Sequence, residues 1–182
     1  MLYVQQSLGP EEELVHVGHF HWMYTLKAIM GIVWGVLLCL TVLVGAIFIE
    51  TKSGFNLSTH GYDPTAGWLD QVRALHPAIK LGAFFMLVMG LIRFAHMMVI
   101  KVTTEIAVTT SRIVYKRGLV ARYVGEMSID RIEGVNVLQS IMGRIFNYGS
   151  VIVRGMGIGE VILPQIADPV AFRKAIDRAR NL

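Results

Sequence analysis

The sequence has little charge and almost no cysteine. Charged residues make up 16% of its 182 residues, against roughly 25% in an average soluble domain, while hydrophobic residues reach 54%. The single cysteine, Cys39, excludes an intramolecular disulfide. The length excludes two large soluble domains, since domains usually have about 100–200 residues. Because the shortage of charge is concentrated before residue 100, we expect a membrane half followed by a soluble half.

A long uncharged run predicts a first transmembrane helix. The 22 residues from Ala28 to Ile49 carry no formal charge. At about 1.5 Å of rise per residue, this length crosses a hydrocarbon core of roughly 30 Å. A cleaved signal peptide is the alternative, but the run is too long for its apolar region, and Glu11 to Glu13 stand where basic residues would be expected. We therefore predict a span over 28–49, preceded by a juxtamembrane segment of residues 1–27.

A second span is predicted over residues 79–100, with charge near both ends. Its uncharged centre, Leu81 to Ile92, has only 12 residues, which a buried helix of a soluble protein could also have. The segment can span if Lys80 and Arg93 extend their charged groups toward opposite interfaces. Arg93 could also be a functional intramembrane charge, but its position near the end of the span favours the first interpretation. Residues 50–78 then form an extracytoplasmic loop.

The distribution of charge predicts the orientation. The segment 50–80 has three basic and three acidic residues, whereas the chain from Arg93 to its end has 13 basic and seven acidic residues. The positive-inside rule places the basic part in the cytoplasm, and with two spans the N-terminus lies there too. We expect a multi-pass protein of the cytoplasmic membrane with both termini inside.

The hydrophobic pattern changes after Lys101 to the period of two that is typical of strands. Strands are predicted over 102–108, 112–116, 119–127, 132–139, 148–154 and 160–163. A short helical turn over 140–146 is expected to bury Ile141, Ile145 and Phe146. A final amphipathic helix is predicted from its N-cap Asp168 onward, with a proline at the first helical position. The fold class is therefore α+β: a two-helix transmembrane hairpin followed by about six or seven antiparallel strands that a C-terminal helix covers.

Three stretches of the segment 101–182 carry a family resemblance. They are 104–109 with 112–119, 139–149 with 151–155, and 166–169 with 172–173, and the segment 18–22 adds to them. In this order they resemble the bacterial pleckstrin-homology-like (PH-like) domain of small membrane proteins. The resemblance implies a bacterial inner-membrane protein with a strongly bent β sandwich or barrel, closed at one end by the C-terminal helix. It implies no catalysis, and a shared fold does not carry phosphoinositide binding with it.

Five basic residues are candidates for contact with lipid headgroups. Lys116 and Arg117 belong to a predicted hairpin turn and Arg122 to the next strand, while Arg93 and Lys101 are close to the membrane. Each cation near an anionic surface contributes on the order of 1 kcal/mol to membrane attraction. An ordinary solvated turn is the alternative for the hairpin group.

The most metal-like pattern is the cluster His16, His19 and His21. Imidazoles bind Zn, Cu, Ni and Fe, but in an extended segment His16 lies on the face opposite the other two. Amphipathic side chains beside the membrane are the preferred interpretation. We therefore expect no metal site and no cofactor.

Small residues in the spans are candidates for helix packing. Gly31 and Gly35 form a small-xxx-small pair, and Gly82 and Gly90 have a similar role in the second span. These glycines either bring the chain's own two helices together or contact another subunit.

The function expected from these observations is that of a non-catalytic module on the cytoplasmic face of the membrane. It serves as a docking or assembly platform, or it contacts anionic lipid, so membrane lipids and either a protein partner or a second copy are expected. Nucleic acid is not expected, because the positive-inside rule accounts for the pI of about 9.4. Two alternatives are an accessory subunit of a larger membrane complex, bound through its helices, and a metal-dependent membrane enzyme that uses the histidine cluster.

Overall fold

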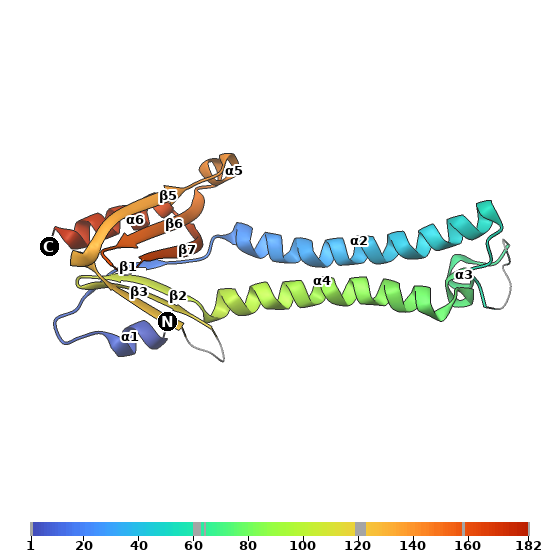
Figure 1. The fold of residues 1–182 in the computed structure, drawn as a ribbon, viewed down its shortest axis with the longest axis horizontal. Helices are drawn as coiled ribbons and strands as arrows, with labels where there is room; N and C mark the ends of the chain where they lie inside the picture. Colours follow the sequence, from blue (N-terminus) through green and yellow to red (C-terminus); the bar gives the residue numbers. More distant parts are fainter. Residues whose placement is uncertain (1, 60–62, 64, 119–122, 158, 182) are drawn as a thin grey trace. The chain divides into compact units, whose positions relative to one another are not determined.

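The computed structural model of the chain describes residues 2–59, 63, 65–118, 123–157 and 159–181. These residues form two compact units. The first unit combines the described residues up to Thr25 with those from Met98 onward, and the second comprises Leu26–Met97. The first unit contains the strands, and the second contains most of two long helices (Figure 1).

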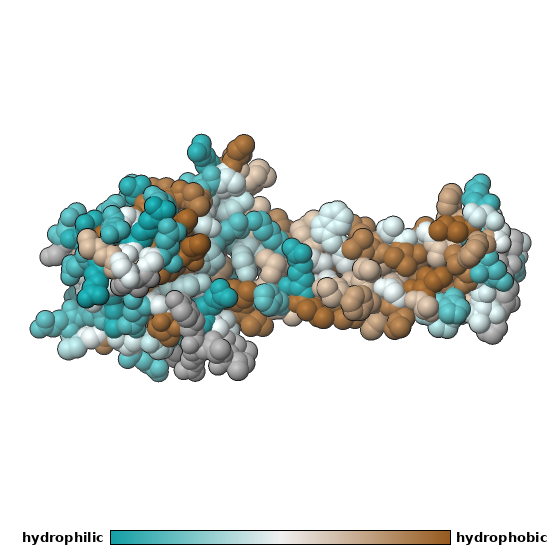
Figure 2. Space-filling model, viewed as in Figure 1, coloured by the Kyte–Doolittle hydropathy of each residue, from teal (hydrophilic) through white to brown (hydrophobic). Residues whose placement is uncertain are grey.

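The long helices are α2, Trp22–Ser53, and α4, Pro77–Thr103. Both are longer than the predicted spans. α2 ends where Gly54 takes a left-handed φ of 63°, and α4 begins with proline at a position where its missing N–H costs nothing. Both are long and apolar enough to cross a membrane. Each contains an 18-residue apolar window, with a mean hydropathy of 2.8 in α2 and 2.0 in α4, and only 11% of each window is buried. Their apolar side chains are therefore mostly exposed (Figure 2).

The connection between the long helices is folded onto the end of α2. It contains the short helix α3, Trp68–Ala74. Glu50 is only 4% exposed, and its carboxylate accepts hydrogen bonds from the Ser58 hydroxyl at 2.8 Å and the Ser58 N–H at 3.0 Å. Ser58 in turn pairs with the buried Leu75 in an isolated antiparallel bridge. The buried carboxylate thus replaces its lost hydration with hydrogen bonds that hold the loop.

Seven strands in the described part of the chain form two antiparallel sheets. The first sheet has the order β1-β2-β3-β4 and comprises Leu14–Gly18, Glu105–Thr109, Arg112–Arg117 and Tyr123–Ser128. The second has the order β5-β6-β7 and comprises Ile132–Leu138, Tyr148–Gly155 and Gly159–Ala167. The remaining elements are the helices α1, Leu2–Ser7, α5, Ile141–Ile145, and α6, Pro169–Arg180, and the 3-10 turn η1, Ile129–Arg131. The predicted antiparallel sheets and C-terminal helix are confirmed.

α6 covers a core that both sheets share. Asp168 is its N-cap, as predicted, and its carboxylate accepts a hydrogen bond from the Ala171 N–H at 3.2 Å. On the inner face of the helix, Phe172 and Ile176 are almost fully buried. They belong to one cluster with side chains from both sheets, among them Ile106, Ile113, Val151, Val153, Leu163 and Ile166.

The strand β1 was not predicted, because residues 1–27 were expected to form a separate juxtamembrane segment. β1 pairs with β2, and Gly18 lies opposite Ile106. Beyond β1 the chain reaches the second sheet, where the Ala167 N–H donates to the carbonyl of His19 at 2.8 Å. The N-terminal segment therefore belongs to the folded domain and joins its two sheets.

Two local predictions are wrong. Val102 and Thr103 are helical, because α4 continues to Thr103 and the first predicted strand begins only at Glu105. The expected burial of Ile141, Ile145 and Phe146 does not occur, since these side chains are 80%, 67% and 39% exposed. Their periodicity correctly indicated a helical turn, but the turn has no core on its apolar face.

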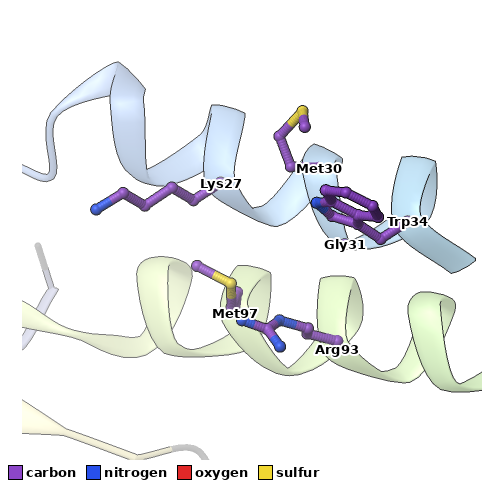
Figure 3. Close-up of a pocket in the computed structure, with 6 residues that line it drawn as sticks. All are labelled: Lys27, Met30, Gly31, Trp34, Arg93 and Met97. Atoms are coloured by element: carbon purple, nitrogen blue, oxygen red, sulfur yellow. The ribbon is translucent and has the colours of Figure 1, made fainter.

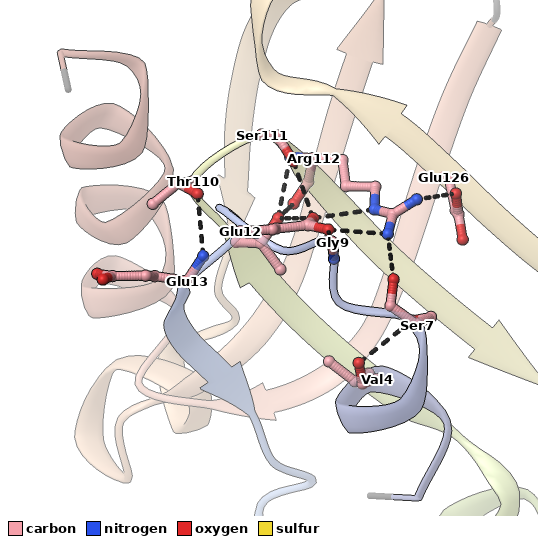
Figure 4. A network of polar contacts seen from close by, with 10 residues as sticks. Val4, Ser7, Gly9, Glu12, Glu13, Thr110, Ser111, Arg112 and Glu126 are labelled. Carbon is pink, nitrogen blue, oxygen red and sulfur yellow. Dashed lines mark hydrogen bonds and ion pairs between the residues drawn. The ribbon is translucent and has the colours of Figure 1, made fainter.

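A polar network ties the N-terminal segment to the first sheet (Figure 4). The carboxylate of Glu12 accepts two hydrogen bonds from the Arg112 guanidinium at 2.9 and 3.0 Å, and others from the Thr109 hydroxyl at 2.6 Å and the Gly9 N–H at 2.9 Å. Burial raises the pKa of Glu12, but these hydrogen bonds outweigh it and lower the pKa to about 2. The ionised form is therefore favoured in the folded state.

The substitution Glu12→Gln should lower the free energy of unfolding of the domain by about 1–3 kcal/mol, because a charged hydrogen-bonding partner of Arg112 is lost. Protonation has the same effect. Because the folded-state pKa is lowered, the stabilisation is complete above the ordinary carboxylate pKa and is lost as the pH falls toward about 2.

Thermal melting in detergent, at pH 7 and at pH 3, measures both effects. The wild type should lose more stability than Glu12→Gln over this interval. The control is Glu11→Gln, which changes an exposed neighbour and should leave the melting temperature unchanged. Equal acid sensitivity of the wild type and Glu12→Gln would contradict the assignment.

Candidate functional site

A cleft of about 410 Å³ opens between α2 and α4. We call it the basic cleft, because it contains two cations. Figure 3 shows the six residues around it, which are Lys27, Met30, Gly31 and Trp34 from α2 and Arg93 and Met97 from α4. The described residues that surround it include no carboxylate.

The helical repeat places these side chains together. Lys27, Gly31 and Trp34 are spaced i, i+4 and i+7, which puts them on one face of α2. Arg93 and Met97 are spaced i and i+4 on α4. A Cβ added at Gly31 would lie 3.5 Å from Cγ and Cδ of Arg93, so the glycine leaves room for the aliphatic part of the arginine.

The electrostatic character of the basic cleft is set by Arg93. A guanidinium keeps its charge in proteins and offers five N–H donors. Within the described ranges, no carboxylate forms an ion pair with Arg93. Trp34 is 59% exposed and Met30 is 41% exposed, so large apolar surfaces stand next to the cations. The arrangement suits a ligand with an anionic group and an apolar part.

The four described members of the predicted basic set lie in different surroundings. Arg93 belongs to the helical unit, whereas Lys101 lies in the first unit and donates to the Thr25 hydroxyl at 2.6 Å. Lys116 forms an ion pair with Glu105 at 3.2 Å. Arg117 is exposed at the end of β3, and Arg122 lies outside the described residues.

The ion pair of Lys116 is structural. Glu105 also accepts hydrogen bonds from the N–H groups of Tyr3 and Val4, at 3.2 and 3.3 Å, which fix α1 on the sheet. Burial raises the pKa of Glu105, but these hydrogen bonds and Lys116 bring it below its ordinary value. The charge of Lys116 is thus largely balanced within the domain.

The three histidines occupy different environments. His16 packs edge-on against Phe172, with ring centroids 5.8 Å apart, and burial lowers its pKa. His21 is stacked on Tyr148 at 5.1 Å, and His19 is exposed. Across the described part of the chain, no group of three His, Cys, Asp or Glu residues could hold a metal ion.

Three of the four predicted packing glycines lie where α2 and α4 approach each other. A Cβ at Gly90 would lie 2.7 Å from the carbonyl oxygen of Gly31 and 2.9 Å from Cα of Gly35. The small-xxx-small pair of α2 is therefore used by the chain's own second helix. Gly82 is different, because no described atom lies within 4 Å of its added Cβ.

Sequence reasoning found Arg93 but missed Lys27 and Trp34. Lys27 adjoins the predicted start of the first span, where a lysine is an ordinary flanking residue. The spacing of Lys27, Gly31 and Trp34 was a usable signal for a common helix face, although only the packing of α2 on α4 brings Arg93 to that face.

Comparison with known proteins gives one match. The family model described as Bacterial PH domain matches residues 65–180, which include α3, α4 and the domain from β2 to α6. No curated protein and no solved structure matches the chain. The matched range does not include β1 or α2.

Gly90→Val should destabilise the helix pair by about 1–3 kcal/mol, because its side chain would overlap backbone atoms of Gly31 and Gly35. The matched control is Gly82→Val, which places the same side chain in open space on the same helix. Thermal loss of helical circular dichroism in detergent measures the difference. Similar melting of the two variants would contradict the close approach of the helices at Gly90.

Proposed function

The chain belongs to the bacterial PH domain family, and from this premise we propose that it is a non-catalytic membrane module whose basic cleft holds the headgroup of an anionic lipid. The PH domain then serves as a docking platform at the cytoplasmic face. The proposal rests on Arg93, which lies in the cleft between two apolar helices. Among the described residues, no carboxylate forms an ion pair with it.

The anchoring in the membrane is supported by the exposed apolar surface of both helices. α4 has 27 residues and α2 has 32, so their lengths are about 40 and 48 Å, more than the roughly 30 Å of a hydrocarbon core. Only 11% of each apolar window is buried, so the helices do not resemble core helices of a soluble protein. The excess of Lys and Arg after Arg93 supports a cytoplasmic domain.

The energetic cost of placing the Arg93 charge among apolar side chains supports a lipid ligand. A charge among apolar side chains is costly unless it reaches water or an anion. Lys27 is five residues from the start of α2, about 7.5 Å along the helix, which puts it near the headgroup level. A lipid phosphate at this level would accept bidentate hydrogen bonds from the guanidinium and a further one from the ammonium group.

The apolar wall of the cleft supports an amphiphilic ligand over a free anion. Met30, Trp34 and Met97 flank the two cations. Acyl chains would lie against these side chains while the phosphate faces Arg93. Trp34 suits the boundary between the headgroup and the acyl chains, where tryptophan is common. Among the described residues around the cleft there is no histidine, cysteine, hydroxyl or carboxylate, which favours holding a ligand over acid–base or nucleophilic chemistry.

Arg93→Gln should weaken retention of an anionic phospholipid by at least about tenfold, since charged hydrogen bonds are worth about 1.5–3 kcal/mol. The measurement is the ratio of bound phosphatidylglycerol to phosphatidylcholine after purification from mixed bilayers, read by native mass spectrometry. The matched control is Lys80→Gln, which removes a cation near the opposite end of α4 and should leave the ratio unchanged.

Equal retention by the wild type and Arg93→Gln would overturn the proposal. Displacement of the lipid by millimolar inorganic phosphate would also overturn it, because the site would then be a general anion site. A partial loss with Arg93→Lys is expected, because lysine keeps the charge but not the bidentate geometry.

A further inference from the structure

The turn between β5 and β6 carries a cluster of exposed apolar side chains. We call it the apolar tip; it comprises Leu138, Ile141, Met142, Ile145 and Phe146. Ile141 and Ile145 are 80% and 67% exposed, which is far more than a folded domain usually leaves to large aliphatic side chains. α5 projects beyond the strands of its own sheet (Figure 1). A contiguous apolar surface of this kind usually marks an interaction site.

The apolar tip is exposed although its backbone is well ordered by hydrogen bonds. The Ser140 hydroxyl caps α5 by accepting from the Gly143 N–H at 3.1 Å, and the Gln139 side chain donates to the carbonyls of Gly143 and Tyr148 at 3.3 Å. A Cβ at Gly143 would lie 2.5 Å from the Tyr148 carbonyl oxygen, so only glycine fits there. Asn147 closes the turn with a φ of 55°. The apolar side chains are thus held outward by an ordered turn.

The apolar tip adjoins the residue at which the first long helix begins. Phe146 packs edge-on against Trp22, with ring centroids 5.8 Å apart. The neighbouring residues reinforce this contact, since His21 stacks on Tyr148 at 5.1 Å. Trp22 is the first residue of α2 and is itself 54% exposed. The surface of the tip is therefore continuous with the start of α2, the helix that contains the first predicted span.

The charge around the apolar tip suits an anionic surface. No Asp or Glu occurs between Glu133 and Glu160. Arg144, which is exposed on α5, is the one formal charge between Glu133 and Arg154. An arginine beside an apolar surface can lay its aliphatic part on that surface and direct its guanidinium to phosphates. A membrane rich in anionic lipid fits this combination better than a protein surface with mixed charge.

We propose that the apolar tip inserts into the interfacial region of the bilayer beside Trp22 and gives the domain a membrane contact of its own. The occupant of this surface is lipid at the boundary between headgroups and acyl chains. The inference rests on the membrane anchoring of the proposed function, but not on lipid binding in the basic cleft. A tethered domain needs only a small apolar insertion, because the two helices already hold it at the surface.

A single environment-sensitive fluorophore tests the insertion in the full chain. The label is attached through Ile145→Cys in a Cys39→Ser background, and the protein is placed in vesicles of phosphatidylcholine and phosphatidylglycerol. Lipids with a nitroxide near the headgroup should quench the label at position 145 at least threefold more than a label introduced by Val170→Cys. Val170 is the matched control, because it is an exposed apolar residue on α6.

A second variant makes the test independent of a label at position 145. Ile141→Asp combined with Ile145→Asp changes only exposed side chains, so the melting temperature in detergent should stay the same. A label introduced by Met142→Cys should lose its quenching in this variant. Equal quenching at positions 145 and 170 would overturn the proposal, as would crosslinking of the Ile145→Cys thiols between two copies without lipid quenching.

The lipid proposals can fail separately. Arg93→Gln should leave the quenching at position 145 unchanged while it lowers phosphatidylglycerol retention. If Arg93→Gln retains phosphatidylglycerol as well as the wild type does but the label at position 145 is quenched, the insertion of the apolar tip stands and lipid binding in the basic cleft is rejected. If retention falls with Arg93→Gln as expected but the label is not quenched in the wild type, the basic cleft stands and the insertion of the apolar tip is rejected.

Discussion

The antiparallel pairing of β1 with β2 is the contact on which the rest of the structure depends. β1 leads into α2 after three residues, and β2 follows α4 after one residue, Thr104. Because both connections are so short, the pairing fixes the start of one long helix and the end of the other at neighbouring strands. The Glu12–Arg112 network secures the segment before β1, and the hydrogen bond from Ala167 to His19 secures the segment after it. A change that released β1 would therefore affect both helices at once.

Local signals were sufficient for most of the fold. Uncharged runs predicted the long helices, alternation predicted the strands after β1, and Asp168 followed by proline predicted the start of α6. β1 had no comparable signal, because it has five residues and its partner in β2 is about 90 positions away in the sequence. Its partly exposed side chains give no clear alternation. Such a strand is defined by long-range pairing, which a single sequence does not reveal.

The basic cleft was predictable only in part, because only one of its two cations stands out as a charge in the sequence. Arg93 stood out because one formal charge in an apolar run is unusual, whereas Lys27 looked like a normal residue at the end of a span. The sequence-based expectation for Lys116 did not include a partner within the domain, whereas the β2–β3 register places Lys116 opposite Glu105. That neutralising pair could have been found from the hairpin, since cross-strand neighbours of opposite charge attract each other.

The wrong prediction at α5 points to a property that α5 shares with the long helices. Periodicity shows that a segment has an apolar face, but such a face can be buried either in a protein core or in a lipid bilayer. The difference appears only in the folded chain, where α2, α4 and α5 all leave large apolar side chains exposed. The glycine-dependent turn holds Ile141 and Ile145 outward, and such exposure is unfavourable in water because aliphatic groups are poorly hydrated. The proposed insertion of α5 into the bilayer interface would give its apolar face an apolar surrounding, and the contact between Phe146 and Trp22 makes the surface of α5 continuous with the first residue of α2.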